Sequence, residues 1–141
     1  MAYSSPKEGH AAVSHYCPFC YIRTESTLLF NEVGVAIADT FPVTNGHTLV
    51  LPRRHVASLY ELDEAEQAAL WRLVAQVRQQ LSDRHRTDGF NIGLNDGQAA
   101  GQTIGHAHIH IIPRYNGDVP DPRGGVRWVV PDRAAYWEYG R

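Results

Sequence analysis

The 141-residue chain has no long uninterrupted run of apolar residues. A membrane-spanning helix needs about 20 such residues, and a secretory signal needs an apolar core near the N-terminus. Neither pattern is present, so we expect no membrane partner and, by default, a soluble cytoplasmic protein. No internal repeat is evident, and the length suits one domain with a substantial core better than two.

A strong excess of charge is also missing. The formal net charge is −2, and no basic run is longer than a pair such as Arg53-Arg54. A dedicated nucleic-acid-binding protein needs a clustered basic surface. The composition therefore predicts no nucleic acid partner.

The glycine-rich fingerprints of the common nucleotide folds are absent too, because neither the Walker A spacing nor the Rossmann spacing occurs. Instead, His106, His108 and His110 alternate with apolar residues. Successive side chains of a strand point to opposite faces, so the three imidazoles are predicted to share one face. Histidine can act as nucleophile, acid or base near neutral pH, which makes this a candidate active-site strand.

One metal ion bound by all three histidines is a weaker interpretation. The outer two would lie roughly 13 Å apart at Cα, whereas a zinc–nitrogen bond is about 2 Å long. No cluster of two or more acidic residues lies beside the histidines, so a two-metal phosphatase mechanism has no visible ligands. The pattern favours chemistry along the strand.

The segment before the histidines, residues 95–105, is rich in small and polar residues. A glycine such as Gly101 has no Cβ, so backbone N–H groups near it can approach an anion. Gln102 and Thr103 add neutral hydrogen-bond donors. Alone, the segment could equally be an ordinary connection; beside three histidines, it is predicted to bind phosphate.

These residues together resemble the signature of a known family. Ala100-Gly101-Gln102-Thr103, two further residues, the three alternating histidines, two hydrophobic residues and Pro113-Arg114 are similar to the motif of the histidine triad family of nucleotide hydrolases and transferases. The stretch from Asp39 to Pro52 is similar to the nucleoside-binding half of that family. The resemblance spans roughly residues 16 to 115.

The resemblance implies a role for each matching residue. His108 would be the nucleophile that attacks the α-phosphorus, and His110 would bind a phosphate oxygen. Further matches concern the substrate. Asp39 would bind the ribose hydroxyls, and Asn95 would bind the phosphate. Gln102 and Thr103 would contact the phosphate or the leaving group, and His47 would lie near the site. Gln102 and the two histidines form the predicted catalytic set, and Gly101 belongs to the predicted phosphate-binding loop.

The only two cysteines stand three positions apart, as Cys17 and Cys20. This spacing fits half of a tetrahedral zinc site, a redox pair, or two free or oxidised cysteines, although no thioredoxin-like context surrounds it. The pair is similar to one in a zinc-containing bacterial subset of the same family. That resemblance implies a structural Zn²⁺ with His55 and His106 as the other ligands, and it implies no organic cofactor.

The predicted fold is α+β, with a mostly antiparallel sheet and one long helix. Asp63 followed by Glu66 resembles a capping box, and apolar residues recur at helical spacing up to Leu81, so a helix of about 20 residues is expected. Strands are expected at residues 33–38, 48–51 and 90–94 and along the histidines, with one more short strand suggested at 126–130. Residues 1–15 are predicted to be a flexible tail, 16–115 the catalytic domain, and 116–141 an extension that packs on the domain or on a dimer partner.

The sequence therefore predicts a homodimeric hydrolase that acts at an α-phosphate through a covalent nucleotidyl-histidine intermediate. Dinucleoside polyphosphates or nucleoside phosphoramidates, preferably with adenine, are the expected substrates. Two alternatives stay open. One is a nucleotidyltransferase or phosphorylase that uses phosphate or a sugar phosphate as acceptor, and the other is a non-catalytic nucleotide-binding module.

Overall fold

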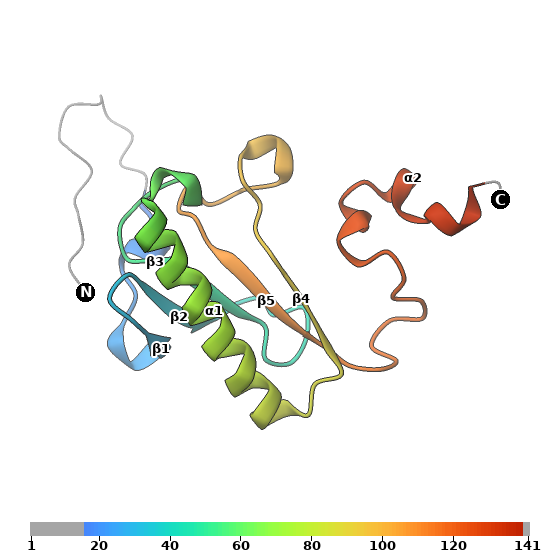
Figure 1. Ribbon diagram of the computed structural model, residues 1–141, viewed down its shortest axis with the longest axis horizontal. Helices are drawn as coiled ribbons and strands as arrows, with labels where there is room; N and C mark the ends of the chain where they lie inside the picture. The colour runs from blue at the N-terminus through green and yellow to red at the C-terminus, as the bar shows by residue number, and fades with distance from the viewer. Residues whose placement is uncertain (1–15, 140–141) are drawn as a thin grey trace.

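A computed structural model describes residues 16–139, so the predicted N-terminal tail lies outside the described residues (Figure 1). One five-stranded sheet has the order β1-β2-β3-β5-β4, and every neighbouring pair is antiparallel. The strands are β1 Thr27–Phe30, β2 Gly34–Ala38, β3 Thr48–Pro52, β4 Gly89–Gly93 and β5 Ile109–Arg114. The long helix α1, Glu64–His85, lies across one face of the sheet. The α+β prediction is confirmed.

Helix α1 begins and ends where local chemistry directs. The Asp63 side chain accepts a hydrogen bond from the Glu66 backbone N–H, and the Glu66 side chain accepts one from the Asp63 N–H. This capping box satisfies two backbone donors that a helix otherwise leaves unpaired. At the other end Arg86, with φ of 49°, takes the left-handed conformation that commonly ends a helix. Within the described residues, no helix is long and apolar enough to cross a membrane.

Apolar side chains cover both faces of the sheet at β3, where all five positions are buried. On the α1 face, Val50 packs with helix residues such as Leu73 and with Ile109 of β5. On the opposite face a second cluster holds Val35, Leu49 and Leu51 under Phe19, Ile22 and Ile37. Because side chains alternate along a strand, this second layer fixes the N-terminal segment over the same sheet face that carries the later histidines.

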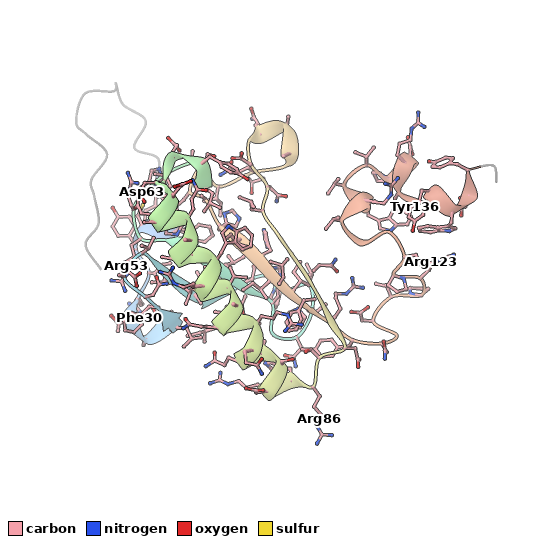
Figure 2. The ribbon with its side chains drawn as sticks, viewed as in Figure 1. Phe30, Arg53, Asp63, Arg86, Arg123 and Tyr136 are labelled. Atoms are coloured by element: carbon pink, nitrogen blue, oxygen red, sulfur yellow. The ribbon has the colours of Figure 1, made fainter. Side chains whose placement is uncertain are left out.

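After β5 the chain forms a small unit that projects away from the sheet (Figure 1). It contains the 3-10 helices η5, Gly125–Val129, and η6, Tyr136–Glu138, and the short helix α2, Pro131–Ala134. The unit holds itself together: Arg123 stacks on Trp137 at 4.3 Å and Arg127 on Tyr136 at 4.9 Å (Figure 2). The predicted division into domain and extension stays a prediction.

The suggested strand at residues 126–130 is wrong, because this segment is mostly the 3-10 helix η5. Gly124 and Gly125 have φ of 94° and 48° and turn the chain tightly. The Arg127 N–H then donates to the Gly124 carbonyl, and the Val130 N–H donates to the Arg127 carbonyl. These local bonds satisfy backbone groups that a strand would pair with a neighbour.

We expect Gly34→Ala to destabilise the fold by about 1–3 kcal/mol, the usual cost of overpacking a core. A Cβ at Gly34 would lie 2.4 Å from Leu70 Cδ2 and 2.8 Å from the backbone oxygen of Leu51, which cannot move without distorting β3. Gly89→Ala is the matched control, because a Cβ at this strand glycine meets nothing within 4 Å. Denaturant unfolding measures both, and equal midpoints for the two variants would refute the close contact.

Candidate functional site

Strand β5 places the histidines differently from the sequence prediction. Its ladder begins at Ile109, so His110 lies within the strand, whereas His106 lies in a bend and His108 in the irregular segment between that bend and the strand. His106 is fully buried, whereas His108 and His110 are half-buried with ring centroids 5.1 Å apart. Only His108 and His110 therefore form a pair that a ligand can reach.

The His108 ring is held in one tautomer. Its Nδ1 lies 2.8 Å from the backbone oxygen of His106. A carbonyl oxygen only accepts hydrogen bonds, so Nδ1 must donate and carry the proton. The neutral ring then has its lone pair on Nε2, which is the arrangement that a nucleophilic imidazole needs.

The His110 ring is oriented by a hydrogen-bonded chain. The Val43 backbone N–H donates to Nδ1 of His47, so the neutral His47 ring carries its proton on Nε2. That nitrogen lies 2.9 Å from Nδ1 of His110 and 3.4 Å from a carboxylate oxygen of Asp39. His110 therefore accepts at Nδ1 and presents an Nε2–H donor. Burial lowers the pKa of His47 and of His110, which keeps both rings neutral near pH 7.

Asp39, His47 and His110 also lie close enough together to surround a cation. However, the Val43 N–H occupies Nδ1 of His47, so Nε2 of the neutral ring is protonated and has no lone pair for a metal. The group is therefore a hydrogen-bonded chain and not a ligand set. Asp39 has a second contact, because its other carboxylate oxygen accepts from the Phe41 N–H at 2.8 Å and so starts the turn toward Pro42.

The loop between β4 and β5 is tied back by one side chain. Gln102 accepts from the Gly97 N–H at 2.9 Å and donates to the carbonyls of Ala57 and Ile104. Its amide is thus occupied by backbone groups, and the predicted contact with the phosphate would require an exchange of partners. Gly101 and Thr103 are exposed on this loop. Gly101 has a φ of 93°, and a Cβ at this position would meet no atom within 4 Å.

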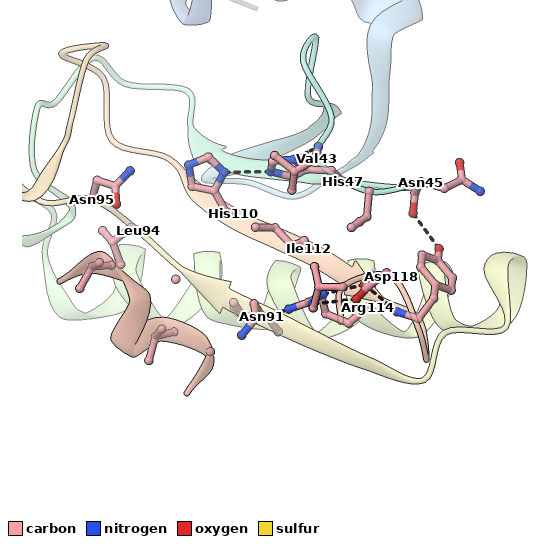
Figure 3. Close-up of a pocket in the computed structure, with 18 residues that line it drawn as sticks. Val43, Asn45, His47, Asn91, Leu94, Asn95, His110, Ile112, Arg114 and Asp118 are labelled. Carbon is pink, nitrogen blue, oxygen red and sulfur yellow. Dashed lines mark hydrogen bonds and ion pairs between the residues drawn. The ribbon is translucent and has the colours of Figure 1, made fainter. Parts of the chain in front are cut away.

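A cavity of about 770 Å³ opens beside His110 and Asn95. Figure 3 shows its lining along the sheet face, from His110 past Ile112 to Arg114. Residues of the C-terminal unit, such as Val129, also line it. Gly93 pairs with His110 across the two strands and has no side chain to fill the space next to the ring. Sequence reasoning missed this cavity; the only signal was Ile112, which follows the histidines on their own face.

Arg114 fixes the direction in which the chain leaves β5. Its guanidinium makes a two-pronged contact with Asp118 at 2.7 Å and donates to Asn91 on β4. The hydrogen bonds from Arg114 hold the pKa of the Asp118 carboxyl far below its usual range. The cavity wall on this side is therefore held by charge-assisted hydrogen bonds, which are stronger than neutral ones.

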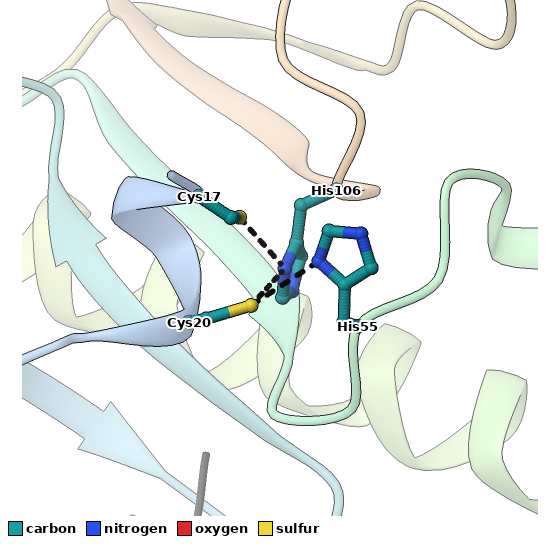
Figure 4. A group of neighbouring side chains, drawn as sticks. All are labelled: Cys17, Cys20, His55 and His106. Carbon is teal, nitrogen blue, oxygen red and sulfur yellow. Dashed lines mark hydrogen bonds between the residues drawn. The ribbon is translucent and has the colours of Figure 1, made fainter. Parts of the chain in front are cut away.

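A second group, the cysteine–histidine cluster, brings together Cys17, Cys20, His55 and His106 (Figure 4). Nδ1 of His106 lies 3.5 Å from Sγ of Cys17 and 3.6 Å from Sγ of Cys20, and Nδ1 of His55 lies 3.1 Å from Sγ of Cys20. The structure thus assembles the four residues that the family resemblance implied as metal ligands.

The donor chemistry of the cluster fits Zn²⁺. Nε2 of His106 donates to the Pro52 carbonyl at 2.7 Å, so the lone pair of Nδ1 faces the sulfur atoms. A hydrogen-bonded outer nitrogen of this kind is typical of metal-ligating histidines. Burial and then the adjacent Cys17 raise the pKa of the Cys20 thiol to about 12. A cation would reverse this effect, because a metal ion stabilises bound thiolates.

Three comparisons place these features beside known proteins. The family model described as "HIT domain" matches residues 23–117. An adenylylsulfatase of Arabidopsis thaliana is 39% identical over 106 residues, covering 72% of this chain and 54% of the relative. A bis(5′-adenosyl)-triphosphatase of Dictyostelium discoideum is 35% identical over 97 residues, covering 69% and 65%. The crystal structure of a zinc-bound histidine triad family protein from Mycobacterium smegmatis has a TM-score of 0.61 and 33% identity, covering 73% and 79%.

Proposed function

Because this chain belongs to the HIT family, we propose that it is a nucleotide hydrolase that acts at an α-phosphate through a covalent nucleotidyl-histidine. The observation that carries the proposal is the pair of fixed tautomers, with Nε2 of His108 as a free nucleophile beside an Nε2–H donor on His110. The names of the adenylylsulfatase and of the bis(5′-adenosyl)-triphosphatase both point to adenine nucleotides as the compounds those relatives act on. Dinucleoside polyphosphates or adenylyl phosphoramidates are accordingly the proposed substrates.

The reaction proceeds in two displacements. Nε2 of His108 attacks the α-phosphorus, a P–N bond forms, and the P–O or P–N bond to the leaving group breaks with its electron pair. His110 donates a hydrogen bond to a phosphoryl oxygen where negative charge develops. Water then attacks the same phosphorus and releases one proton to the solvent, the P–N bond returns its electron pair to Nε2 of His108, and the nucleoside monophosphate is released. Dividing one hard displacement into two easier ones is the usual gain from a covalent intermediate.

The acceptor in the second step decides between hydrolase and transferase. The 770 Å³ cavity beside His110 has room for an acceptor larger than water, which favours phosphate or a sugar phosphate as the second candidate. A panel of adenylyl substrates, with product analysis with and without added phosphate, separates the classes. Formation of a nucleoside diphosphate would identify a phosphorylase, and binding without turnover across the panel would identify a binding module.

For the nucleoside, we propose that Asp39 binds the ribose hydroxyls while Asn95 and the 95–105 loop bind the phosphate. Ile37 of β2 lies on the sheet face that Phe19 and Ile22 cover, and Asp39, just after the end of β2, lies beside His47, which contacts His110 on that same face. The partly buried apolar side chains supply a surface for a base, and the carboxylate supplies a charged acceptor next to it.

Asp39→Ala should therefore weaken binding of ribonucleotides more than binding of 2′-deoxy analogues, by about 1.5–3 kcal/mol, the range for hydrogen bonds to charged groups. Asp39→Asn is the matched control, because its side-chain oxygen can still accept from the Phe41 N–H and preserve the turn. Titration calorimetry with AMP and 2′-deoxy-AMP measures the difference. If Asp39→Ala discriminates the two ligands as well as the parent does, Asp39 only starts the turn.

The cysteine–histidine cluster would hold one structural Zn²⁺. When bound, the ion supplies a cross-link between the N-terminal segment and the sheet, and it takes no part in the displacements. The four ligands come from three separate segments of the chain, so the site exists only in the folded protein, and the free energy of metal binding adds to the free energy of unfolding.

We also propose that the active form is a homodimer. Val126 and Val129 on η5 are 65% and 80% exposed, although both line the cavity beside the active histidines. Apolar residues exposed together next to a cavity mark contact surfaces. Sedimentation analysis at micromolar concentration tests this, and a monomer there would contradict it.

A further inference from the structure

Residue 106 belongs to both of the sites described above. Its side chain points Nδ1 at the two cysteine sulfurs, while its backbone oxygen accepts the hydrogen bond that fixes the tautomer of His108. A shift of this residue therefore moves the acceptor that orients the nucleophile. The Nε2–Pro52 bond restrains one end of the His106 ring, and the cysteine cluster restrains the other.

The neighbouring backbone strengthens this connection. The Ala107 N–H donates to the Val56 carbonyl at 2.7 Å. Val56 follows His55, and Ala107 follows His106. This hydrogen bond therefore joins the two segments that carry the histidines of the cluster, one residue after each histidine. Closing the cluster around a metal would hold both segments, and with them the start of the histidine run.

Phe19 makes a second connection through side chains. It stands between Cys17 and Cys20, and its ring edge meets His106 at 5.9 Å and His108 at 5.1 Å between centroids. Phe19 belongs to the 3-10 helix η1, Pro18–Cys20, whose backbone hydrogen bonds are local, such as the bond from the Cys20 N–H to the Cys17 carbonyl. The cysteine side chains tie this helix to His55 and His106, so metal binding there would set where Phe19 lies.

We propose that metal binding at the cysteine–histidine cluster and nucleotide binding at His108 are thermodynamically coupled through His106 and Phe19. The metal site is then a positioning device for the nucleophile and for the apolar surface beside it, in addition to its structural role. Coupling between two binding equilibria is reciprocal. A bound nucleotide must therefore raise the affinity for the metal by the same factor by which the metal raises the affinity for the nucleotide. This inference rests on the proposed nucleotide site.

The first experiment needs no nucleotide. Two-bond proton–nitrogen correlation spectra of the histidine rings distinguish the Nδ1–H from the Nε2–H tautomer, and the His108→Gln spectrum assigns the signal. The zinc-loaded protein should show His108 as a single Nδ1–H tautomer. After removal of zinc with a chelator, the signal should shift toward a mixture of tautomers. A His108 signal that is identical in the loaded and the metal-free protein would overturn the coupling.

The second experiment measures the reciprocal effect. The zinc affinity of the protein is measured by equilibrium competition with a chromogenic chelator, with and without saturating AMP. AMP should tighten zinc binding by at least about fivefold, at the lower end of typical couplings. If calorimetry shows that AMP binds but the zinc affinity is unchanged, the coupling is refuted. If AMP does not bind at all, the proposed function fails instead, and the tautomer spectra still decide the coupling.

Two variants test whether the Phe19 ring carries the coupling or whether any loss of a phenylalanine ring loosens the protein enough to weaken it. Phe19→Leu keeps all four cluster residues and removes the ring contacts, so it should reduce the effect of AMP on zinc affinity to the part that the His106 carbonyl carries. Phe30→Leu is the matched control, because Phe30 lies on β1, is 64% exposed, and contacts Arg53 instead of the cluster. Retention of the full AMP effect in Phe19→Leu would remove Phe19 from the pathway and leave the His106 carbonyl as the sole route.

Discussion

Turnover should fall by at least about a thousandfold when His108 is replaced by alanine, because deleting a covalent nucleophile removes the first displacement altogether. The fold should remain intact, since the half-buried ring faces the site and its one hydrogen bond goes to an adjacent backbone oxygen. Steady-state hydrolysis of an adenylyl substrate, measured beside the thermal melting curve, separates lost chemistry from lost structure.

Two further measurements make this test specific. His85→Ala is the control, because it removes a histidine at the end of α1 whose ring contacts Asn45 outside the catalytic pair. In His108→Gly, free imidazole can occupy the vacated space and should restore part of the turnover. Rapid quenching with a slow, labelled substrate should place the phosphorus on His108, and label on any other histidine would contradict the assignment.

The second large effect concerns the metal. The purified parent should contain about one zinc per chain, and the double variant Cys17→Ser/Cys20→Ser should contain none. A ligand present at about a thousand times its dissociation constant stabilises the folded state by about 4 kcal/mol. For a chain of this length each kcal/mol corresponds to a few degrees, so the melting temperature should fall by about 10 °C or more.

The chelator-treated parent controls for effects of serine itself, and its melting temperature should match that of the double variant in the same buffer. Elemental analysis gives the zinc content, and a thiol reagent gives the number of free cysteines. A zinc-free parent in which both thiols react at once would show that the cluster holds no metal.

Sequence patterns anticipated the elements that local chemistry specifies. Helix α1 could be predicted because the Asp63–Glu66 capping box and the 3.6-residue apolar period both act within a few residues. The strand at the end of the histidine run could be predicted because period-two alternation is typical of a strand, but only His110 lies within β5, and His106 and His108 precede it. The family motif supplied the cysteine–histidine cluster, whose members are too far apart in sequence for spacing alone to unite them.

What the sequence could not show depends on contacts between distant segments. The cavity beside His110 depends on the pairing of Gly93 with His110 and on the return of Val129 from the C-terminal unit, and neither fact has a local signature in the sequence. The sequence suggests that the Gln102 side chain is free to donate to a ligand. In the structure its amide accepts from the Gly97 N–H and donates to the Ala57 carbonyl. Phe19 reads as part of a cysteine motif, and only the packed structure reveals that it covers the histidine face.

The position of β5 between β3 and β4, although it comes last of the five strands in sequence, has a consequence for biosynthesis. A ribosome adds about 5–20 residues per second, so β1, β2, β3 and α1 can pack together before β5 has been synthesised. Until β5 pairs with β3, one edge of β3 is open, and an open strand edge is a template for aggregation. Cys17 is likewise synthesised 89 residues before His106, so the cysteine–histidine cluster cannot close until that histidine has been added. We expect oxidants to react with the Cys17 and Cys20 thiols mainly while the nascent chain is incomplete, because the cluster cannot bind a metal before His106 is added.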